Sequence, residues 1–287
     1  MENQAVEIDC KKWIDLRALY LPESTETILG LSTLNNYIKW NEKQSPIPNL
    51  TIFSLNGDWS DGTFVLIDRN HIYCDTLNKS IERLKLLLDL MDYSKVIRVM
   101  HVRSKCYPAI TDIFKQKKFN LEYDHPNYLY YLPKEEAIIL DVQLPEGFDS
   151  GPLSQSDVVT ANAAWEFRHP GSLFYLQRLA RLNISYGIFD KENNEMISSG
   201  FQTQTGPVGT IYTNPKYRNR GFGTFVAKII FKKIGESGQG AIACVKEMNV
   251  ASRAIFEKIG CQIIDKVNWI SLAKCDWTDE TDLELNL

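Results

Sequence analysis

The chain has 287 residues, of which 44% are hydrophobic and 24% are charged, and its 32 Lys and Arg residues against 36 Asp and Glu residues give a net charge of −4. This length is enough for two domains, and the composition excludes a disordered, collagen-like or disulfide-framework protein. The small negative charge gives the whole molecule no general attraction for nucleic acid or membrane surfaces, so any polyanion site has to come from a local group of basic residues.

The sequence predicts an intracellular protein, cytoplasmic or mitochondrial. Its N-terminus lacks the apolar core of a signal peptide, and no run approaches the roughly 18 apolar residues of a membrane span. The six cysteines are scattered without a Cys-x-x-Cys pair, and the four histidines show no ligand spacing. We therefore expect reduced thiols, no metal site, and no nucleic-acid or membrane partner, while the oligomeric state stays open.

Taken in chain order, the first half alternates helical and strand patterns. Helix-like runs lie between Lys11 and Trp40. They are followed by predicted strands at residues 50–55, 63–68 and 71–76, a helix at 80–91, a strand at 96–101, a helix at 105–117 and a strand at 121–132.

The second half gives nearly the same order of elements. It begins with a predicted strand at residues 137–141, helices at 154–165 and 173–182, and strands at 185–190, 195–203 and 209–213. A helix at 224–237, a buried strand at 241–245 and a helix from Asn249 to Gly260 follow. The chain then has two closing strands at 261–267 and 269–273 and a solvated acidic tail at 276–284. We therefore predict two tandem α/β units, each a mixed and mostly antiparallel sheet flanked by helices, with domains at 1–135 and 136–287.

The clearest chemical signal lies between the strand at 209–213 and the helix that follows it. A helix N-terminus carries unpaired N–H groups and a partial positive charge, and Gly221 and Gly223 allow those groups to approach an anion closely. Six basic residues and no acidic one lie between residues 216 and 233. The segment suits a phosphate-bearing ligand, and the alternative is a plain strand-to-helix turn with solvated lysines. It matches neither the GxxxxGK[ST] nor the GxGxxG nucleotide signature.

This order of strand, Arg-x-x-Gly-x-Gly, long helix, buried strand and Asn-capped helix resembles the GNAT superfamily of N-acetyltransferases. Tyr212-Thr213-Asn214-Pro215 and Asn249-x-x-Ser252, with Trp165 and Ser199-Gly200 upstream, are similar to its glycine N-acyltransferase-like branch. The resemblance covers residues 137–274. It implies two GNAT-like units, the first of them a degenerate copy.

The resemblance also implies a function and a set of binding residues. The function is an N-acyltransferase that uses acetyl-CoA or another acyl-CoA as co-substrate and a small amine, such as glycine or another amino acid, as acceptor. Strand residues would pair with the pantetheine arm, the loop would wrap the pyrophosphate, and the next helix would contact the arm. These residues are Ile211, Tyr212 and Thr213 on the strand, Arg218, Asn219, Arg220, Gly221, Phe222, Gly223 and Thr224 in the loop, and Asn249 and Phe256 on the helix.

Two departures leave the acid and base of the reaction open. GNAT enzymes usually carry a proton-donating Tyr where this chain has Phe256, and glycine N-acyltransferases carry a Glu on a strand that here, at residues 202–213, contains no acid. Glu247 and His169 are the remaining catalytic candidates. Without a catalytic role, Glu247 would be a surface glutamate and His169 a plain loop histidine.

The alternative function is a CoA-binding sensor or interaction module without catalysis. A third function, protein N-terminal acetylation, would need a peptide-wide cleft.

Overall fold

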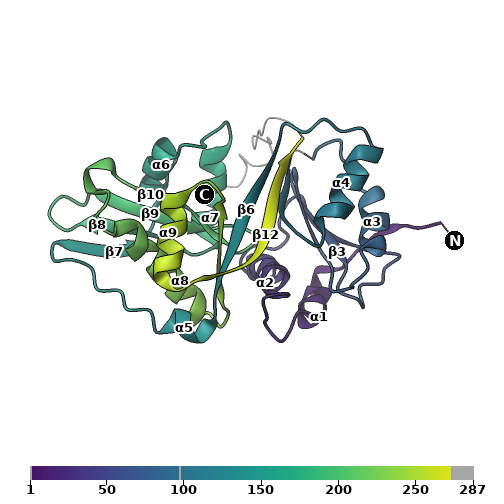
Figure 1. The fold of residues 1–287 in the computed structure, drawn as a ribbon, viewed down its shortest axis with the longest axis horizontal. Helices are drawn as coiled ribbons and strands as arrows, with labels where there is room; N and C mark the ends of the chain where they lie inside the picture. Colours follow the sequence, from purple (N-terminus) through teal and green to yellow (C-terminus); the bar gives the residue numbers. More distant parts are fainter. Residues whose placement is uncertain (1, 97, 273–287) are drawn as a thin grey trace. The chain divides into compact units, whose positions relative to one another are not determined.

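The computed structural model describes residues 2–96 and 98–272, which fold into two compact units. The first unit runs up to Tyr128 and takes in the segment that begins at Asp265, and the second spans Leu129–Ile264. In both units helices cover a mixed, mostly antiparallel sheet, which confirms the predicted fold class (Figure 1).

The sheet of the first unit has the strand order β1-β2-β3-β4-β5-β12. Its neighbours are antiparallel except for the parallel pair β4 and β5. The strands are β1 (Ala5–Glu7), β2 (Leu50–Leu55), β3 (Phe64–Asp68), β4 (His71–Asp75), β5 (Arg98–Arg103) and β12 (Gln262–Ser271), and the helices are α1 (Trp13–Ala18), α2 (Ile28–Lys43), α3 (Glu82–Asp89) and α4 (Tyr107–Gln116).

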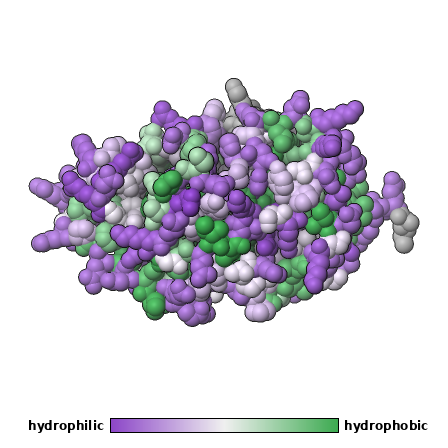
Figure 2. Space-filling view, in the orientation of Figure 1, coloured by the Kyte–Doolittle hydropathy of each residue, from purple (hydrophilic) through white to green (hydrophobic). Residues whose placement is uncertain are grey.

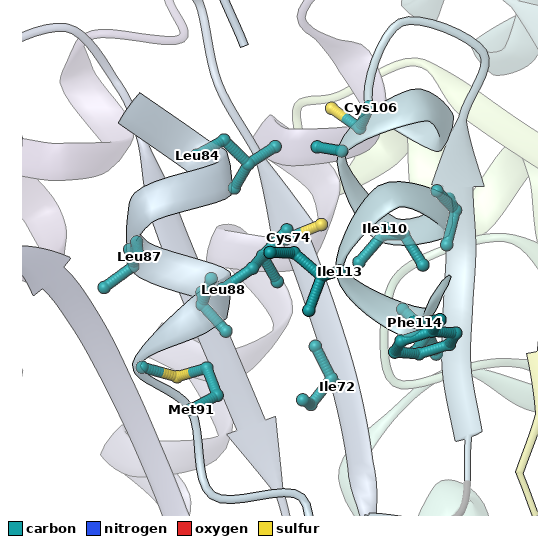
Figure 3. Packing of buried hydrophobic residues seen from close by; sticks show 14 of the residues in the cluster. Ile72, Cys74, Leu84, Leu87, Leu88, Met91, Cys106, Ile110, Ile113 and Phe114 are labelled. Atoms are coloured by element: carbon teal, nitrogen blue, oxygen red, sulfur yellow. The ribbon is translucent and has the colours of Figure 1, made fainter. Parts of the chain in front are cut away.

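The core of the first unit lies between its sheet and the pair α3 and α4. Leu84, Leu87 and Leu88 of α3 are buried, as are Ile110 and Ile113 of α4, and in each helix the three- to four-residue spacing places these side chains on one face. Figure 3 shows Leu84 of α3 and Ile113 of α4 pointing into the space between the two helices, where Ile72 and Cys74 of β4 also lie. The apolar stripes of the two helices thus fix them on the sheet.

The second unit has the strand order β6-β11-β10-β9-β8-β7. Its strands are β6 (Tyr123–Leu132), β7 (Phe148–Pro152), β8 (Ser185–Asp190), β9 (Met196–Gln202), β10 (Val208–Thr213) and β11 (Ala241–Lys246), and its helices are α5 (Lys134–Ile138), α6 (Gln155–Ala164), α7 (Ser172–Leu182), α8 (Phe222–Glu236) and α9 (Val250–Ile259).

Two glycines of this sheet show which helix covers which face. A Cβ atom on Gly200 of β9 would lie 2.9 Å from Ile230, so α8 packs directly against that face. A Cβ atom on Gly187 of β8 would lie 2.8 Å from Leu153, which precedes α6. Gly187 pairs with Ser199, the neighbour of Gly200, so it points to the opposite face. The sheet is therefore enclosed by α8 on one side and by the start of α6 on the other.

Each half of the sequence ends in a strand that completes the other half's sheet. β12 pairs antiparallel with β5, and β6 lies next to β11. The chain passes from the first unit to the second inside β6, between Tyr128 and Leu129, and returns at Asp265. The domain limits 1–135 and 136–287 stay a prediction. They treat each domain as one continuous segment, whereas the part of β12 from Asp265 groups with the first unit.

Three expectations about elements were wrong. Residues 137–141 were expected as a strand, but α5 reaches Ile138, because Ala137 packs against Gly235 of α8 at a helical turn, where an added Cβ would lie only 3.0 Å away. The two closing strands are the single strand β12, with a bulge between Asn268 and Ile270. The edge strands β1 and β7 were not expected, since neither has a run of apolar residues. The acidic tail at 276–284 lies outside the described residues.

The surface of the face in Figure 2 is mostly hydrophilic, with separate hydrophobic patches. None of the helices in the described part of the chain is long and apolar enough to cross a membrane. The five cysteines among the described residues form no disulfide bond with one another, and burial raises the pKa of Cys74 and Cys106; Cys275 lies outside that part.

Candidate functional site

The two parallel strands at the centre of the second unit separate soon after they meet. β10 pairs with β11 at Val208↔Ala243, and no later residue of β10 among those described pairs with β11. A bulge interrupts β10 between Gly209 and Tyr212, and within it Thr210 has a φ of 51°, which is strained for a β-branched residue. The edge of β10 beyond the bulge is thus available to an extended ligand.

Of the three predicted strand residues, Ile211 lies within this bulge and Tyr212 and Thr213 follow it, and they point to both faces of the sheet. Ile211 and Thr213 face α8, since both lie within 4 Å of the position that a Cβ atom of Gly223 would take. Tyr212 alternates to the other face, where it is paired with Ser199. Its carbonyl oxygen accepts a hydrogen bond from Ser198 Oγ at 2.6 Å, which fixes the backbone of the strand.

The predicted loop ends in a cradle of backbone amides at the start of α8. Gly221 is the N-cap, with a φ of 86°, and it offers no side chain to cap the helix. No described residue accepts a hydrogen bond from the amide groups of Gly221, Phe222 or Gly223, whereas Thr224 already donates to the Gly221 carbonyl. Consecutive free amides at the positive end of a helix form an anion-binding site. The residues present therefore fit a phosphate group.

The two loop glycines have different roles. A Cβ on Gly221 would come no closer than 3.6 Å to a neighbour, so this position needs glycine for its backbone angle. A Cβ on Gly223 would lie 3.1 Å from Ile255 of α9, so this glycine allows α8, α9 and β10 to pack closely. That both glycines serve the approach of an anion stays a prediction. The structure adds that Gly221 has a left-handed backbone angle and that Gly223 has a packing role.

Five of the six basic residues of this segment divide into two groups. Arg218 and Arg220 flank the cradle, where Arg218 donates to the Thr213 carbonyl at 3.2 Å and Arg220 lies over the ring of Tyr217. Both are exposed and can reach an anion at the helix start.

The lysines of α8 are engaged elsewhere. Lys228 and Lys232 donate at 3.2 Å to the carbonyl groups of Asp141 and Leu140, and Lys233 pairs with its helix neighbour Glu236. Lys228 and Lys232 hold the segment after α5, so the positive charge available to an anion comes from the loop and the helix dipole.

Asn249 and Phe256 lie at different depths on α9. Asn249 caps the helix by accepting a hydrogen bond from the Ser252 amide at 3.0 Å, and its neighbours Met248 and Val250 are 88% and 72% exposed. Phe256 is only 2% exposed and packs between Phe231 of α8 and Tyr130 of β6. The start of α9 is open to a ligand, whereas Phe256 belongs to the core.

Tyr130 does not replace the missing proton donor at position 256. Its hydroxyl donates to Glu257 at 3.0 Å and lies 3.4 Å from Nε of Arg253. Burial and the neighbouring carboxylate raise the pKa of Tyr130. This phenol has a structural role between β6 and α9.

The two catalytic candidates lie in connections between elements, outside the helices and strands. Glu247 follows β11, and its carbonyl oxygen accepts from Arg253 at 3.4 Å. His169 lies between α6 and α7, with Nδ1 3.1 Å from the Phe167 carbonyl oxygen. The bulge at Thr210 and the contacts of the loop around His169 were not predicted, because both depend on residues distant in sequence.

The corresponding place in the first unit is filled by charged side chains. Asp75, at the end of β4, is fully buried and lies 3.7 Å from Lys105 and 3.9 Å from Arg103. Arg103 also pairs with Asp265 at 3.1 Å. This network closes the end of the β4 and β5 pair, and the connection to α3 contains no glycine.

Comparisons with known proteins agree with this architecture. The FR47-like protein family model matches residues 185–270, and no curated protein matches the sequence. A Drosophila protein solved by a structural genomics consortium is 21% identical, with 95% of this chain and 99% of that chain covered and a TM-score of 0.85.

Two GNAT proteins have the same fold at lower similarity. A tandem GNAT protein from the clavulanic acid biosynthesis pathway is 11% identical over 96% of this chain and 100% of its own, with a TM-score of 0.55. A GNAT-family acetyltransferase from Colwellia psychrerythraea is 13% identical over 95% of this chain and 100% of its own, with a TM-score of 0.52. The chain therefore has a tandem GNAT fold.

Proposed function

We propose that this protein is an acyl-CoA-dependent N-acyltransferase, which transfers an acetyl or other acyl group directly to the amine of a small acceptor such as glycine or another amino acid. The observation that carries the proposal is the amide cradle of Gly221, Phe222 and Gly223 beside the free edge of β10. A diphosphate at a helix start and an extended amide-bearing arm along a strand are what CoA would present to these two features.

The cradle residues would bind CoA through its phosphates. The amides of Gly221, Phe222 and Gly223 and the positive end of α8 would hold the pyrophosphate, with Thr224 next to them, and Arg218 and Arg220 would add charge at the rim. Asn219 supports this geometry, because its φ of 63° turns the chain toward the helix start.

The strand residues would bind the arm and stabilise the reacting thioester. Ile211, Tyr212 and Thr213 would pair with the arm through their main chain, and a backbone N–H after the bulge would donate to the carbonyl oxygen as negative charge develops on it. Asn249 would contact the arm from α9, where its amide nitrogen remains a donor while Oδ1 caps the helix.

The proposed reaction is tested by thiol release. The purified protein is mixed with acetyl-CoA, butyryl-CoA or benzoyl-CoA and with glycine, glutamine, phenethylamine or spermidine, and free CoA thiol is measured with a chromogenic disulfide. We expect release that depends on both substrates, with the N-acylated amine as the second product. Absence of release with every pair would contradict the transferase activity.

A CoA-binding module without catalysis is the second candidate. The buried position of Phe256, which has no proton to donate, and the absence of an acid in residues 202–213 favour it. The two functions differ in one result, because the module would bind acyl-CoA without releasing thiol in the presence of any amine.

A further inference from the structure

The loop between α6 and α7, residues 165–171, is held in one conformation by hydrogen bonds. Ser172 Oγ donates to Asn162 Oδ1 at 2.6 Å and accepts from the His169 amide at 3.2 Å. The Arg168 amide donates to the Trp165 carbonyl at 3.1 Å. These contacts tie the end of α6 to the start of α7, so the loop is a preformed structure.

The loop contacts the end of β11 directly, and Tyr175 of α7 connects it to the turn before β10. The ring of Phe167 lies 4.2 Å from Lys246 Nζ, at the end of β11. Trp165 stacks on Tyr175, whose hydroxyl donates at 3.0 Å to Gln204 in the turn before β10. The loop is thus attached near the start of β10 through Tyr175 and at the end of β11 through Phe167. A loop attached at both points crosses the region where the two strands separate.

The hydrogen bond of His169 fixes its tautomer. Nδ1 lies 3.1 Å from the Phe167 carbonyl oxygen, and a carbonyl can only accept, so Nδ1 carries the proton. In the neutral imidazole Nε2 is then the basic nitrogen. The ring of Trp165, 6.0 Å away between centroids, packs against the imidazole and orients it.

We propose that His169 is the general base for the acceptor amine, an assignment that rests on the proposed acyltransferase function. Nε2 takes one proton from the ammonium group of the acceptor and passes it to solvent. The freed lone pair forms the C–N bond to the acyl carbon while the C–S bond breaks. A second proton leaves the nitrogen with the departing sulfur, so the products are the amide and CoA with a free thiol.

The first test separates proton transfer from loop structure. His169→Asn keeps a donor near the Phe167 carbonyl and removes the basic nitrogen, and the exposed His125 of the first unit supplies the control His125→Asn. With the amine that the wild type acylates best among glycine, glutamine, phenethylamine and spermidine, we expect His169→Asn to lower kcat by roughly 10²–10⁴ with an unchanged Kd for acetyl-CoA. Imidazole added to His169→Ala should restore part of the rate. An unchanged kcat, or a loss that imidazole does not rescue, overturns the assignment.

The second test reads the position of His169 without turnover. Nε2 of His169 is buried, so its surroundings are read by NMR, with the imidazole resonances assigned from the His169→Asn and His125→Asn variants. We expect saturating acetyl-CoA to shift the His169 resonances and to leave those of His125 unchanged. Unchanged His169 resonances with acetyl-CoA bound overturn the inference alone, whereas no binding of acetyl-CoA overturns the proposed function itself.

Discussion

At the scale of single residues, Gly221 and Gly238 form a matched pair at the two ends of α8. Their φ angles are 86° and 99°, and neither site would bring a Cβ close to another atom. Aspartate tolerates this backbone region better than most residues, so each Gly→Asp change should cost a similar, roughly 1–2 kcal/mol of the free energy of unfolding.

The two variants should differ in binding. Gly221→Asp puts a carboxylate into the amide cradle, and we expect acetyl-CoA affinity to fall by at least about 100-fold because like charges repel at short range. Gly238→Asp should bind as the wild type does. Calorimetric titration and thermal unfolding of both variants check this, and normal affinity in a folded Gly221→Asp protein would show that the phosphates lie elsewhere.

Phe256 gives a second prediction at this scale. Its burial between Phe231 and Tyr130 means that Phe256→Tyr places a hydroxyl in an apolar environment. We expect the free energy of unfolding to fall by roughly 1–3 kcal/mol and thiol release not to increase. Denaturant unfolding and the thiol assay measure the two effects. A faster reaction in a stable variant would mean that the new hydroxyl reaches the leaving group and that position 256 faces the substrate.

At the scale of elements, a comparison of the N-caps of α6 and α9 tests whether Asn249 binds the ligand in addition to capping its helix. Asn249 caps α9, and Ser154 caps α6 through a capping box with Asp157. Asn249→Ser keeps the cap and should leave stability within about 0.5 kcal/mol, whereas Asn249→Ala and Ser154→Ala should each cost about 1 kcal/mol.

Binding distinguishes these helices further. If the Asn249 amide contacts the ligand, both Asn249 variants weaken acetyl-CoA binding and Ser154→Ala does not. Calorimetry on the three variants, with thermal unfolding alongside, checks the expectation. Wild-type affinity for acetyl-CoA in Asn249→Ser would mean that Asn249 caps α9 and does not contact the ligand.

Elements whose pattern is local were predictable from the sequence. The helix α8 shows its apolar face in residues such as Val226 and Ile230, and α9 is bounded by the cap at Asn249 and by Gly260, which takes the left-handed conformation. The loop that carries Gly221 was located for the same reason, since the turn chemistry and the helix start are adjacent in the sequence.

Features set by distant residues could not be predicted. Residues 137–141 have an apolar strand-like pattern, but their packing on α8 near Gly235 makes the first part helical. The bulge at Thr210 depends on pairing with β9. The position of His169 depends on the contact between Phe167 and Lys246, which are 79 residues apart.

At the scale of the whole molecule, burial of His101 links stability to pH. This residue of β5 is fully buried against Trp269, and burial lowers its pKa from 6.5 to about 3. Below pH 6.5 the unfolded chain takes up a proton that the folded chain does not. Stability is therefore lost as pH falls from about 6.5 toward 3.

A substitution at this position should flatten that dependence. Asparagine suits the φ of 49° at His101, so His101→Asn removes the titrating group with little backbone strain. Between pH 6.5 and 5 we expect the wild type to lose about 1.6 kcal/mol more than the variant, because the slope reaches about 1.4 kcal/mol per pH unit only below the pKa of the unfolded histidine. Urea unfolding at several pH values measures the difference, with His125→Asn as the exposed control. Parallel curves for wild type and His101→Asn would refute the linkage.

The exchange of β6 and β12 means that each unit depends on both halves of the chain. The two units nevertheless differ at the end of their parallel strand pair. Free amides at Gly221 lie beside it in the second unit, and the buried Asp75 and Arg103 fill it in the first. The molecule should therefore bind a single acyl-CoA, at the second unit.

Calorimetric titration of the full chain with acetyl-CoA tests this claim most directly. We expect one binding site per chain, and at a ligand concentration of about 100 times Kd the native state should gain roughly 2.7 kcal/mol, a shift of several degrees in Tm. Two sites per chain would contradict the closed site of the first unit. No heat and no thermal shift with acetyl-CoA, longer acyl-CoAs or free CoA would contradict the acyl-CoA site itself.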